Sequence, residues 1–119
     1  MQEFDVLFYT KDNGEKPAQQ FIDGLEPKML ARVYKLIDLL EARGHEIREP
    51  HSKHLSDGIF ELRAEVGSDI SRVLYFFYAG KKAILTNGLI KKTEKTPPDE
   101  IKRAKDYRKD YLSREENKK

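Results

Sequence analysis

The hydrophobic positions in the first half of the chain predict one strand followed by two helices. Residues 4–10 are aromatic and β-branched, as in a strand, and turn-forming residues follow at 11–14. Apolar residues at helical spacing then predict a short helix over 18–25 and a longer one over 29–40. Gly44 suits the left-handed position after the second helix. We expect the two helices to form a hairpin whose apolar side is covered by a sheet.

The middle of the chain has the periodicity of strands. Polar and apolar residues alternate over 60–66, which predicts a half-buried strand. Residues 70–78 are apolar on both faces apart from Arg72, as expected of a central strand. A further strand begins at Ala83 and continues to about Ile90. Because short turns separate these runs, we expect an antiparallel meander.

The last segment predicts a helix. Thr96 suits its N-cap, with Pro97 and Pro98 next and Asp99 completing a near capping box. Residues 114–119 have the composition of a frayed tail. The prediction is an α+β protein in the order β-α-α-β-β-β-α, with a small antiparallel meander sheet packed against an N-terminal helix hairpin and a C-terminal helix. A chain of 119 residues supports one domain, residues 1–119.

Composition excludes several classes of protein. The chain has no cysteine, which excludes disulfide frameworks, thiolate zinc sites and cysteine nucleophiles. The apolar run that begins at Val73 is far shorter than the roughly 20 residues that span a bilayer. The first residues lack the basic start and apolar stretch of a signal peptide. We therefore expect a cytoplasmic protein with no membrane partner.

Charge is distributed unevenly along the chain. Residues 1–80 carry 10 Lys and Arg against 14 Asp and Glu, a balance of −4, whereas residues 81–119 carry 13 against 7, a balance of +6. This asymmetry fits a polyanionic partner. A solvated, lysine-rich terminal helix explains it equally well.

Metal and carboxylate chemistry are both weakly indicated. His45, His51 and His54 cluster before the predicted sheet, but no helix fixes their spacing, so we expect no metal and no cofactor. Glu61 and Glu65 share a strand face with Arg63 between them. This pattern favours a ladder of salt bridges over general acid–base catalysis.

Basic residues offer more. Lys53 and His54 precede the strand that carries Arg63, Arg72 opens the next, and Lys91 and Lys92 leave the last. Neighbouring strands of a meander can bring such residues onto one surface, where they could hold phosphates through charge-assisted hydrogen bonds. A merely solubilising surface is the alternative.

Three segments carry a resemblance to a known family. They are LSDGIFELR at 55–63, SRVLYF at 71–76 and LIKKTEKTP at 89–97. Together with the order of elements, they make the chain similar to the RelE/ParE toxin superfamily, most of all to its phage-derived HigB-like branch. The resemblance implies a toxin of a type II toxin–antitoxin pair. Such toxins are ribosome-dependent, metal-independent endoribonucleases that cut mRNA and inhibit translation, and a helix-turn-helix antitoxin (HigA-like) neutralises them.

The resemblance also implies roles for individual residues. Lys53 or His54 would be the base, Arg63 and Arg72 would stabilise the phosphorane, and Lys92 would be the acid. Lys91 and Lys95 would contact the RNA. RelE-type toxins often use a tyrosine near the C-terminus, and no residue here matches it, because Tyr107 and Tyr111 lie on the predicted last helix.

Two other functions remain open on the sequence. A ParE-like inhibitor of DNA gyrase would share the fold without the RNA chemistry. A non-catalytic nucleic-acid-binding module would use the charge asymmetry for salt-dependent affinity alone.

Overall fold

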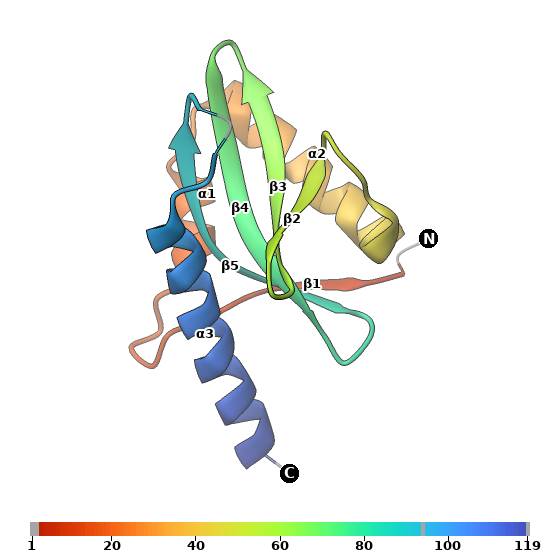
Figure 1. Cartoon of the computed structure of the whole chain (residues 1–119), viewed down its shortest axis with the longest axis vertical. Coiled ribbons are helices and arrows are strands. Elements are labelled where there is room, and N and C mark those ends of the chain that lie inside the picture. The colour runs from red at the N-terminus through yellow and green to blue at the C-terminus, as the bar shows by residue number, and fades with distance from the viewer. Residues whose placement is uncertain (1–2, 94, 119) are drawn as a thin grey trace.

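The structure is a computed structural model that describes residues 3–93 and 95–118, so Glu94 of the basic segment and Lys119 of the predicted tail lie outside the described residues. The elements, in chain order, are β1 (Asp5–Phe8), α1 (Pro17–Asp23), α2 (Pro27–Arg43), a 3-10 turn (Gly44–Glu46), β2 (Ser52–Ser56), β3 (Ile59–Val66), β4 (Asp69–Tyr78), β5 (Lys82–Lys91) and α3 (Pro98–Asn117) (Figure 1). The α+β class is confirmed.

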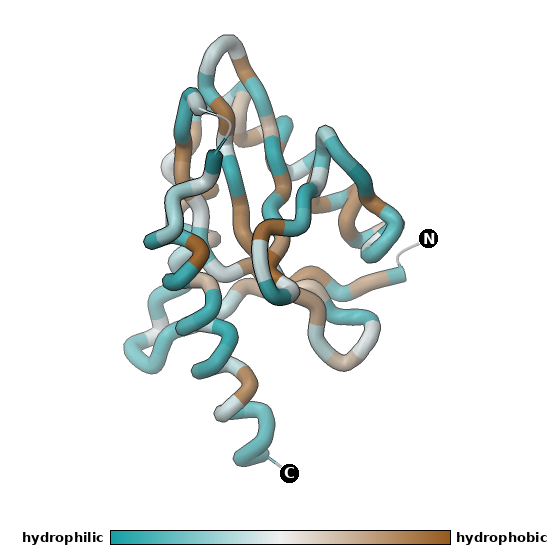
Figure 2. The backbone as a smooth tube through the Cα atoms, viewed as in Figure 1, coloured by the Kyte–Doolittle hydropathy of each residue, from teal (hydrophilic) through white to brown (hydrophobic). Residues whose placement is uncertain are grey.

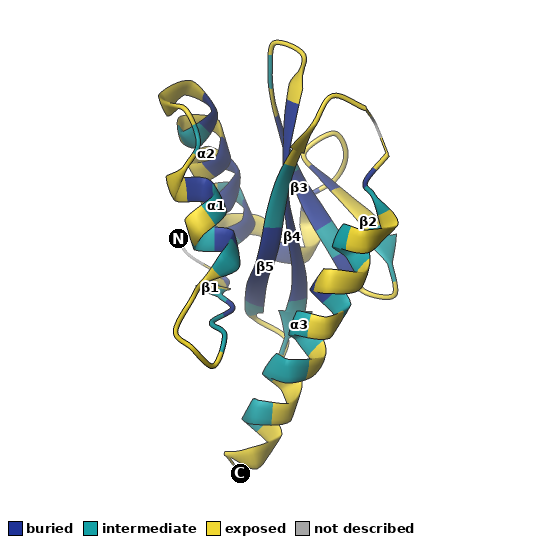
Figure 3. Ribbon diagram, turned by 90° about the vertical axis from the view of Figure 1, so that its left-hand side faces the viewer, coloured by how far each residue is buried: buried dark blue, intermediate teal, exposed yellow. Residues whose placement is uncertain are grey.

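One five-stranded sheet organises the molecule, with the strand order β1-β5-β4-β3-β2. The pairs from β2 to β5 are antiparallel, whereas β1 pairs with β5 in parallel. The helices α1 and α2 lie on one side of the sheet and α3 lies on the other (Figure 3).

Two parts of the predicted architecture are wrong. The sheet is mixed rather than purely antiparallel, because β1 joins it beside β5. The predicted order also lacks β2, a short polar edge strand that has no alternation of apolar residues to reveal it. In addition, α1 and α2 contact the sheet more than each other: α1 packs on β5 and α2 on β3.

The core has two parts, one on each face of the sheet. Leu62, Ala64, Val73 and Tyr75 point to the side of α1 and α2. Residues at the alternate positions of the strands face α3 and include Ile59, Leu74, Phe76 and Ile84. Hydrophobic segments accordingly concentrate in the sheet (Figure 2). The prediction that residues 70–78 form a central strand is confirmed, since β4 is buried on both faces.

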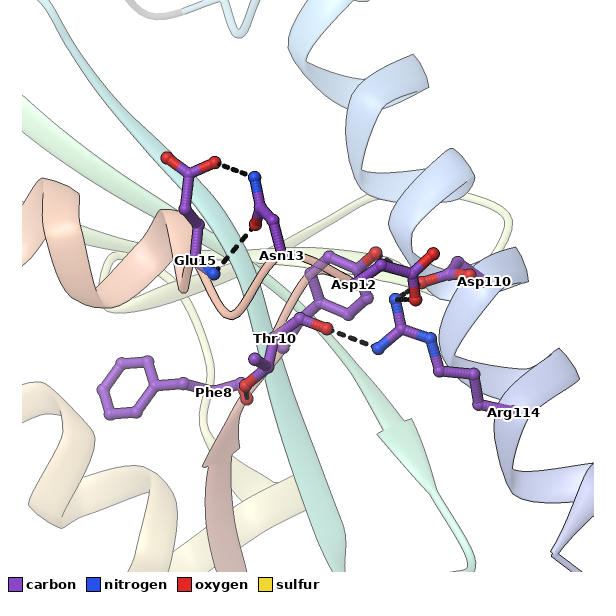
Figure 4. A network of polar contacts seen from close by, with 8 residues as sticks. Phe8, Thr10, Asp12, Asn13, Glu15, Asp110 and Arg114 are labelled. Atoms are coloured by element: carbon purple, nitrogen blue, oxygen red, sulfur yellow. Dashed lines mark hydrogen bonds and ion pairs between the residues drawn. The ribbon is translucent and has the colours of Figure 1, made fainter.

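The C-terminal half of α3 is held by the segment that follows β1. Tyr9 donates a hydrogen bond of 2.5 Å to Asp110, and its ring stacks on Tyr107. Arg114 donates to the Thr10 carbonyl at 2.6 Å and forms ion pairs with Asp12 and Asp110 (Figure 4). Burial, aided by the Asp110 carboxylate, raises the pKa of Tyr9. The helix α3 continues to Asn117, so it includes residues 114–117 of the segment predicted as a tail.

Gly44 is needed at the end of α2 for two reasons. Its φ of +52° lies in the left-handed region, and a Cβ atom placed on it would overlap the ring of Phe4. We expect Gly44→Ala to lower the free energy of unfolding by about 2–4 kcal/mol, which urea denaturation would measure. Gly14→Ala is the matched control, since Gly14 has a φ of +89° and open space around it. Equal losses in the two variants would contradict the proposed overlap with Phe4.

Candidate nucleic-acid interface

Arg63 on β3 and Arg72 on β4 are cross-strand neighbours. The Arg63 N–H donates to the carbonyl of His51, on the β2 side, at 2.9 Å. This N–H group therefore points away from β4, so Arg63 and Arg72 exchange no backbone hydrogen bonds with each other. In antiparallel pairs of this kind the two side chains lie closer together than in hydrogen-bonded pairs. Both side chains project to the α3 face of the sheet. Like charges placed in this way are destabilising unless an acidic group compensates them.

Glu61 supplies the compensating charge, and Thr96 completes the network. Glu61 Oε2 lies 3.5 Å from Arg63 Nε. The Thr96 hydroxyl donates to Glu61 Oε1 at 2.5 Å and accepts from Arg72 Nη1 at 3.0 Å. Glu61 and Arg72 are both 0% exposed, and Thr96 is buried as well. We call Glu61, Arg63, Arg72 and Thr96 the buried charge network.

This network changes the interpretation of two residues. Arg72 was predicted to stabilise the phosphorane, but its complete burial leaves no surface for a phosphate, so in this structure it fastens the segment before α3 instead. Thr96 was predicted to cap α3. Its hydroxyl serves the buried charge network, and the N-cap residue is Pro97 without a side-chain hydrogen bond.

The expected salt-bridge ladder is present only in part. Glu61 pairs with Arg63 along the same strand, yet Glu61 is buried rather than solvated, whereas Glu65 is exposed. Sequence reasoning assigned neither Glu61 nor Thr96 to the site. The sequence did contain a signal for Glu61, because it is a charged residue at a strand position that faces a helix.

The two candidate bases point to opposite faces of the sheet. Lys53 pairs in register with Glu61 and so shares the face of the buried charge network. His54 pairs with Phe60, and its ring packs edge-on against Phe60 on the α2 side. The His54 Nε2 atom accepts a hydrogen bond of 3.1 Å from the Gly58 N–H. The geometry therefore separates Lys53 from His54.

The lysines at the end of β5 extend the basic surface. Leu89 is the cross-strand partner of Arg72, and Lys91 comes two residues after it on β5. Because side chains two residues apart on a strand share a face, Lys91 lies on the same face as Arg72. Lys92 and Lys95 follow in the exposed segment that leads to α3. Four neighbouring strands thus contribute Lys53, Arg63, Arg72 and Lys91 to one face, with the exposed ammonium groups around the buried charge network. His54, which was also predicted for the site, lies on the opposite face of the sheet.

Two tyrosines outside this face, Tyr75 and Tyr111, have raised pKa values. The Tyr75 hydroxyl lies 2.5 Å from Ser52 Oγ and ties β4 to β2, and burial raises the pKa of Tyr75 to about 12. Tyr111 is on α3, where burial and the Glu115 carboxylate raise its pKa to about 12. Both phenols are therefore protonated at neutral pH.

Metal sites and membrane spans can be assessed over the part of the chain that the structure describes. Among residues 3–93 and 95–118, His, Asp and Glu form no group of three or more that could hold a metal ion. No helix in the same part of the chain has the length and apolar character needed to cross a membrane.

Comparison with known proteins adds one relationship. Residues 20–109 match the model of a family described as phage-derived protein Gp49-like (DUF891). The match spans the elements from α1 to most of α3, including the whole of the buried charge network. A search of curated proteins finds no match.

Proposed function

The chain belongs to the Gp49-like family of phage-derived proteins, a RelE-like toxin family, and from this premise we propose that it is a ribosome-dependent mRNA endoribonuclease of a type II toxin–antitoxin system. The observation that carries the proposal is the shared face of Lys53, Arg63 and Lys91, which come from three strands of one sheet. The positive charge of Arg63 and Lys91 in such an arrangement suits a phosphodiester whose negative charge increases in the transition state.

The proposed reaction uses the 2′-OH of the message as the nucleophile. Lys53 acts in its neutral amine form and accepts the 2′-OH proton as the oxygen attacks phosphorus, and Arg63 holds the equatorial oxygens of the phosphorane. The P–O5′ bond then breaks as Lys92 donates a proton to the leaving oxygen, so that a cyclic phosphate and a 5′-OH end result. Lys91 and Lys95 contact neighbouring phosphates, and Arg72 acts as a positioning residue through Thr96.

Two partners belong to the proposal. The ribosome would present the message, because a sparse basic site gains most from a partner that orients the reacting groups. A helix-turn-helix antitoxin would neutralise the toxin, as the relationship to RelE-like toxins suggests.

A message with one 2′-deoxy nucleotide at the cleaved position tests the reaction directly. Purified protein is added to ribosomes that carry either this message or its all-ribose control, and the RNA ends are mapped. We expect cleavage of the control alone, since the deoxy message lacks the nucleophile. Cleavage of both messages, or of naked RNA as fast as ribosome-bound RNA, would contradict the proposal. Broken DNA in expressing cells with intact messages would indicate the gyrase alternative.

The two candidate bases give a separate prediction. Because Lys53 shares the face of Arg63 and His54 does not, Lys53→Ala is expected to lower the cleavage rate by about 10²-fold or more, within the range for general acid–base catalysis. His54→Ala is expected to change it less than tenfold, as it keeps the basic face intact. Single-turnover cleavage on ribosomes measures both. The reverse order of effects would exclude Lys53 as the base.

A further inference from the structure

A second basic surface lies on the opposite side of β3 from α3. Between α2 and β3 is a cleft of about 580 Å³, whose lining includes the basic residues Arg32, Lys35 and His51. Arg63 and Glu65 border it along β3, although their side chains alternate toward the α3 face. Arg32 and Lys35 are exposed and lie one helical turn apart on α2. The cleft therefore has a clear excess of positive charge over negative charge.

The cleft opens where β2 begins, at Ser52, because beyond this point β2 no longer pairs with β3 on that edge. The register of β2 with β3 begins at Ser52 opposite Leu62, and the carbonyl of His51 receives the Arg63 N–H. Since β3 continues to Val66, its last residues extend past β2 and face α2 across the opening. Leu36 and Ala64 provide an apolar floor between the basic walls.

Arg63 connects this cleft to the proposed active face. Its side chain pairs with Glu61 in the buried charge network, and the same residue lines the cleft. One extended polyanion could therefore pass from the face of Lys53 and Arg63, over the edge of β3, to Arg32 and Lys35. A single-stranded nucleic acid has such a continuous, regularly charged backbone, and a cleft of this volume has no room for a double helix.

We propose that the cleft between α2 and β3 is a second binding site for single-stranded RNA, which holds phosphates of nucleotides that flank the one cleaved on the α3 face. The proposal rests on the proposed function in one respect, namely that the nucleotides in the cleft flank the nucleotide that is cleaved. It adds Arg32 and Lys35 as phosphate-contacting residues. The apolar floor gives the flanking base a surface to lie on. The cleft then contributes affinity and placement, whereas the chemistry stays with Lys53, Arg63 and Lys92.

The test measures binding alone. A labelled ten-nucleotide RNA that is fully 2′-O-methylated, and so cannot be cut by its own 2′-OH, is titrated with the full chain at several salt concentrations, without ribosomes. We expect Arg32→Ala/Lys35→Ala to raise the dissociation constant about tenfold or more. The slope of log affinity against log salt should shrink by ~1.4, because each lost phosphate contact on a single strand accounts for ~0.7.

The chain offers a matched control in the same helix. Lys28→Ala/Arg43→Ala removes the same charge from exposed positions of α2 outside the cleft, and it should change the dissociation constant less than threefold. Equal binding of the ten-nucleotide RNA by the two double variants would overturn the proposal.

A competitor identifies the kind of anion. Polyglutamate of equal charge should displace the RNA only weakly, and displacement at equal concentration would overturn the proposal in favour of an acidic peptide. This experiment is independent of cleavage, so a negative result with the 2′-deoxy message would reject the nuclease and leave the RNA-binding cleft in place. The opposite combination of results would reject the cleft and leave the nuclease in place.

Discussion

Replacing Arg63 with alanine is expected to reduce mRNA cleavage on the ribosome by 10²- to 10³-fold, on the order of the loss when one transition-state hydrogen-bond donor is removed. The Arg63 side chain is 9% exposed, whereas Arg72 is fully buried, so Arg63 is the arginine of the basic face that a phosphate can reach. Its planar guanidinium can give two parallel hydrogen bonds to a phosphoryl group. The rate of a single turnover at saturating protein measures this loss.

Two further variants separate charge from geometry and from folding. Arg63→Lys keeps the charge but loses the paired donors, so we expect it to restore only part of the rate. Arg103→Ala removes an exposed arginine of α3 that pairs with Glu100, and it should leave the rate unchanged. Thermal melts of all three check that the fold is retained. If folded Arg63→Ala protein cleaves message like Arg103→Ala protein, Arg63 has no part in the reaction.

Replacing Glu61 with alanine is expected to have the largest effect on stability. The carboxylate pairs with Arg63 and accepts from the Thr96 hydroxyl, which in turn accepts from Arg72, and Glu61, Arg72 and Thr96 are all buried. Removing one partner from such a network leaves buried charge without compensation and costs about 3–5 kcal/mol. Urea denaturation with two spectroscopic probes would measure the loss in the free energy of unfolding.

Glu65→Ala is the control for this change, because Glu65 is on the same strand and exposed. We expect a loss below about 1 kcal/mol for it, as for other surface charges. Glu61→Gln keeps the size and one hydrogen-bond acceptor without the charge, so its stability should lie between those of the alanine variant and wild type. A Glu61→Ala protein as stable as Glu65→Ala would show that the arginines do not depend on this carboxylate.

Local periodicity predicted the strands with strong patterns and missed the one without. Residues 60–66 alternate in polarity and residues 70–78 are apolar throughout, and both became strands. Ser52–Ser56 is a polar edge strand whose existence depends on pairing with β3, and pairing is a tertiary property. The parallel partner of β1 was equally hidden, because periodicity identifies a strand and not its neighbour.

Some features of the candidate site could likewise be predicted from local sequence, and others depend on tertiary contacts. Arg63 and Arg72 could be singled out because each is basic within a strand, and their positions in the sheet follow from one hairpin. Buried Arg72 donates to Thr96, and Thr96 donates to Glu61; these residues come from separate segments of the chain, so no local pattern reveals their contact. The choice between Lys53 and His54 required the register of β2, which a one-residue shift would invert.

The parallel pairing of β1 with β5 has a consequence for biosynthesis. Asp5 pairs with Lys82, so β1, the first strand to be synthesised, can pair only after β5, the last strand, has been synthesised. Until β5 has been made, β1 has no partner strand and the edge of β4 that β5 will cover is open, and non-local pairing of this kind forms slowly. Fragments that end before α3 also lack Arg114, which fastens the Thr10 carbonyl. Prematurely terminated copies are therefore expected to be degraded or to aggregate, and only complete translation products should acquire the final architecture.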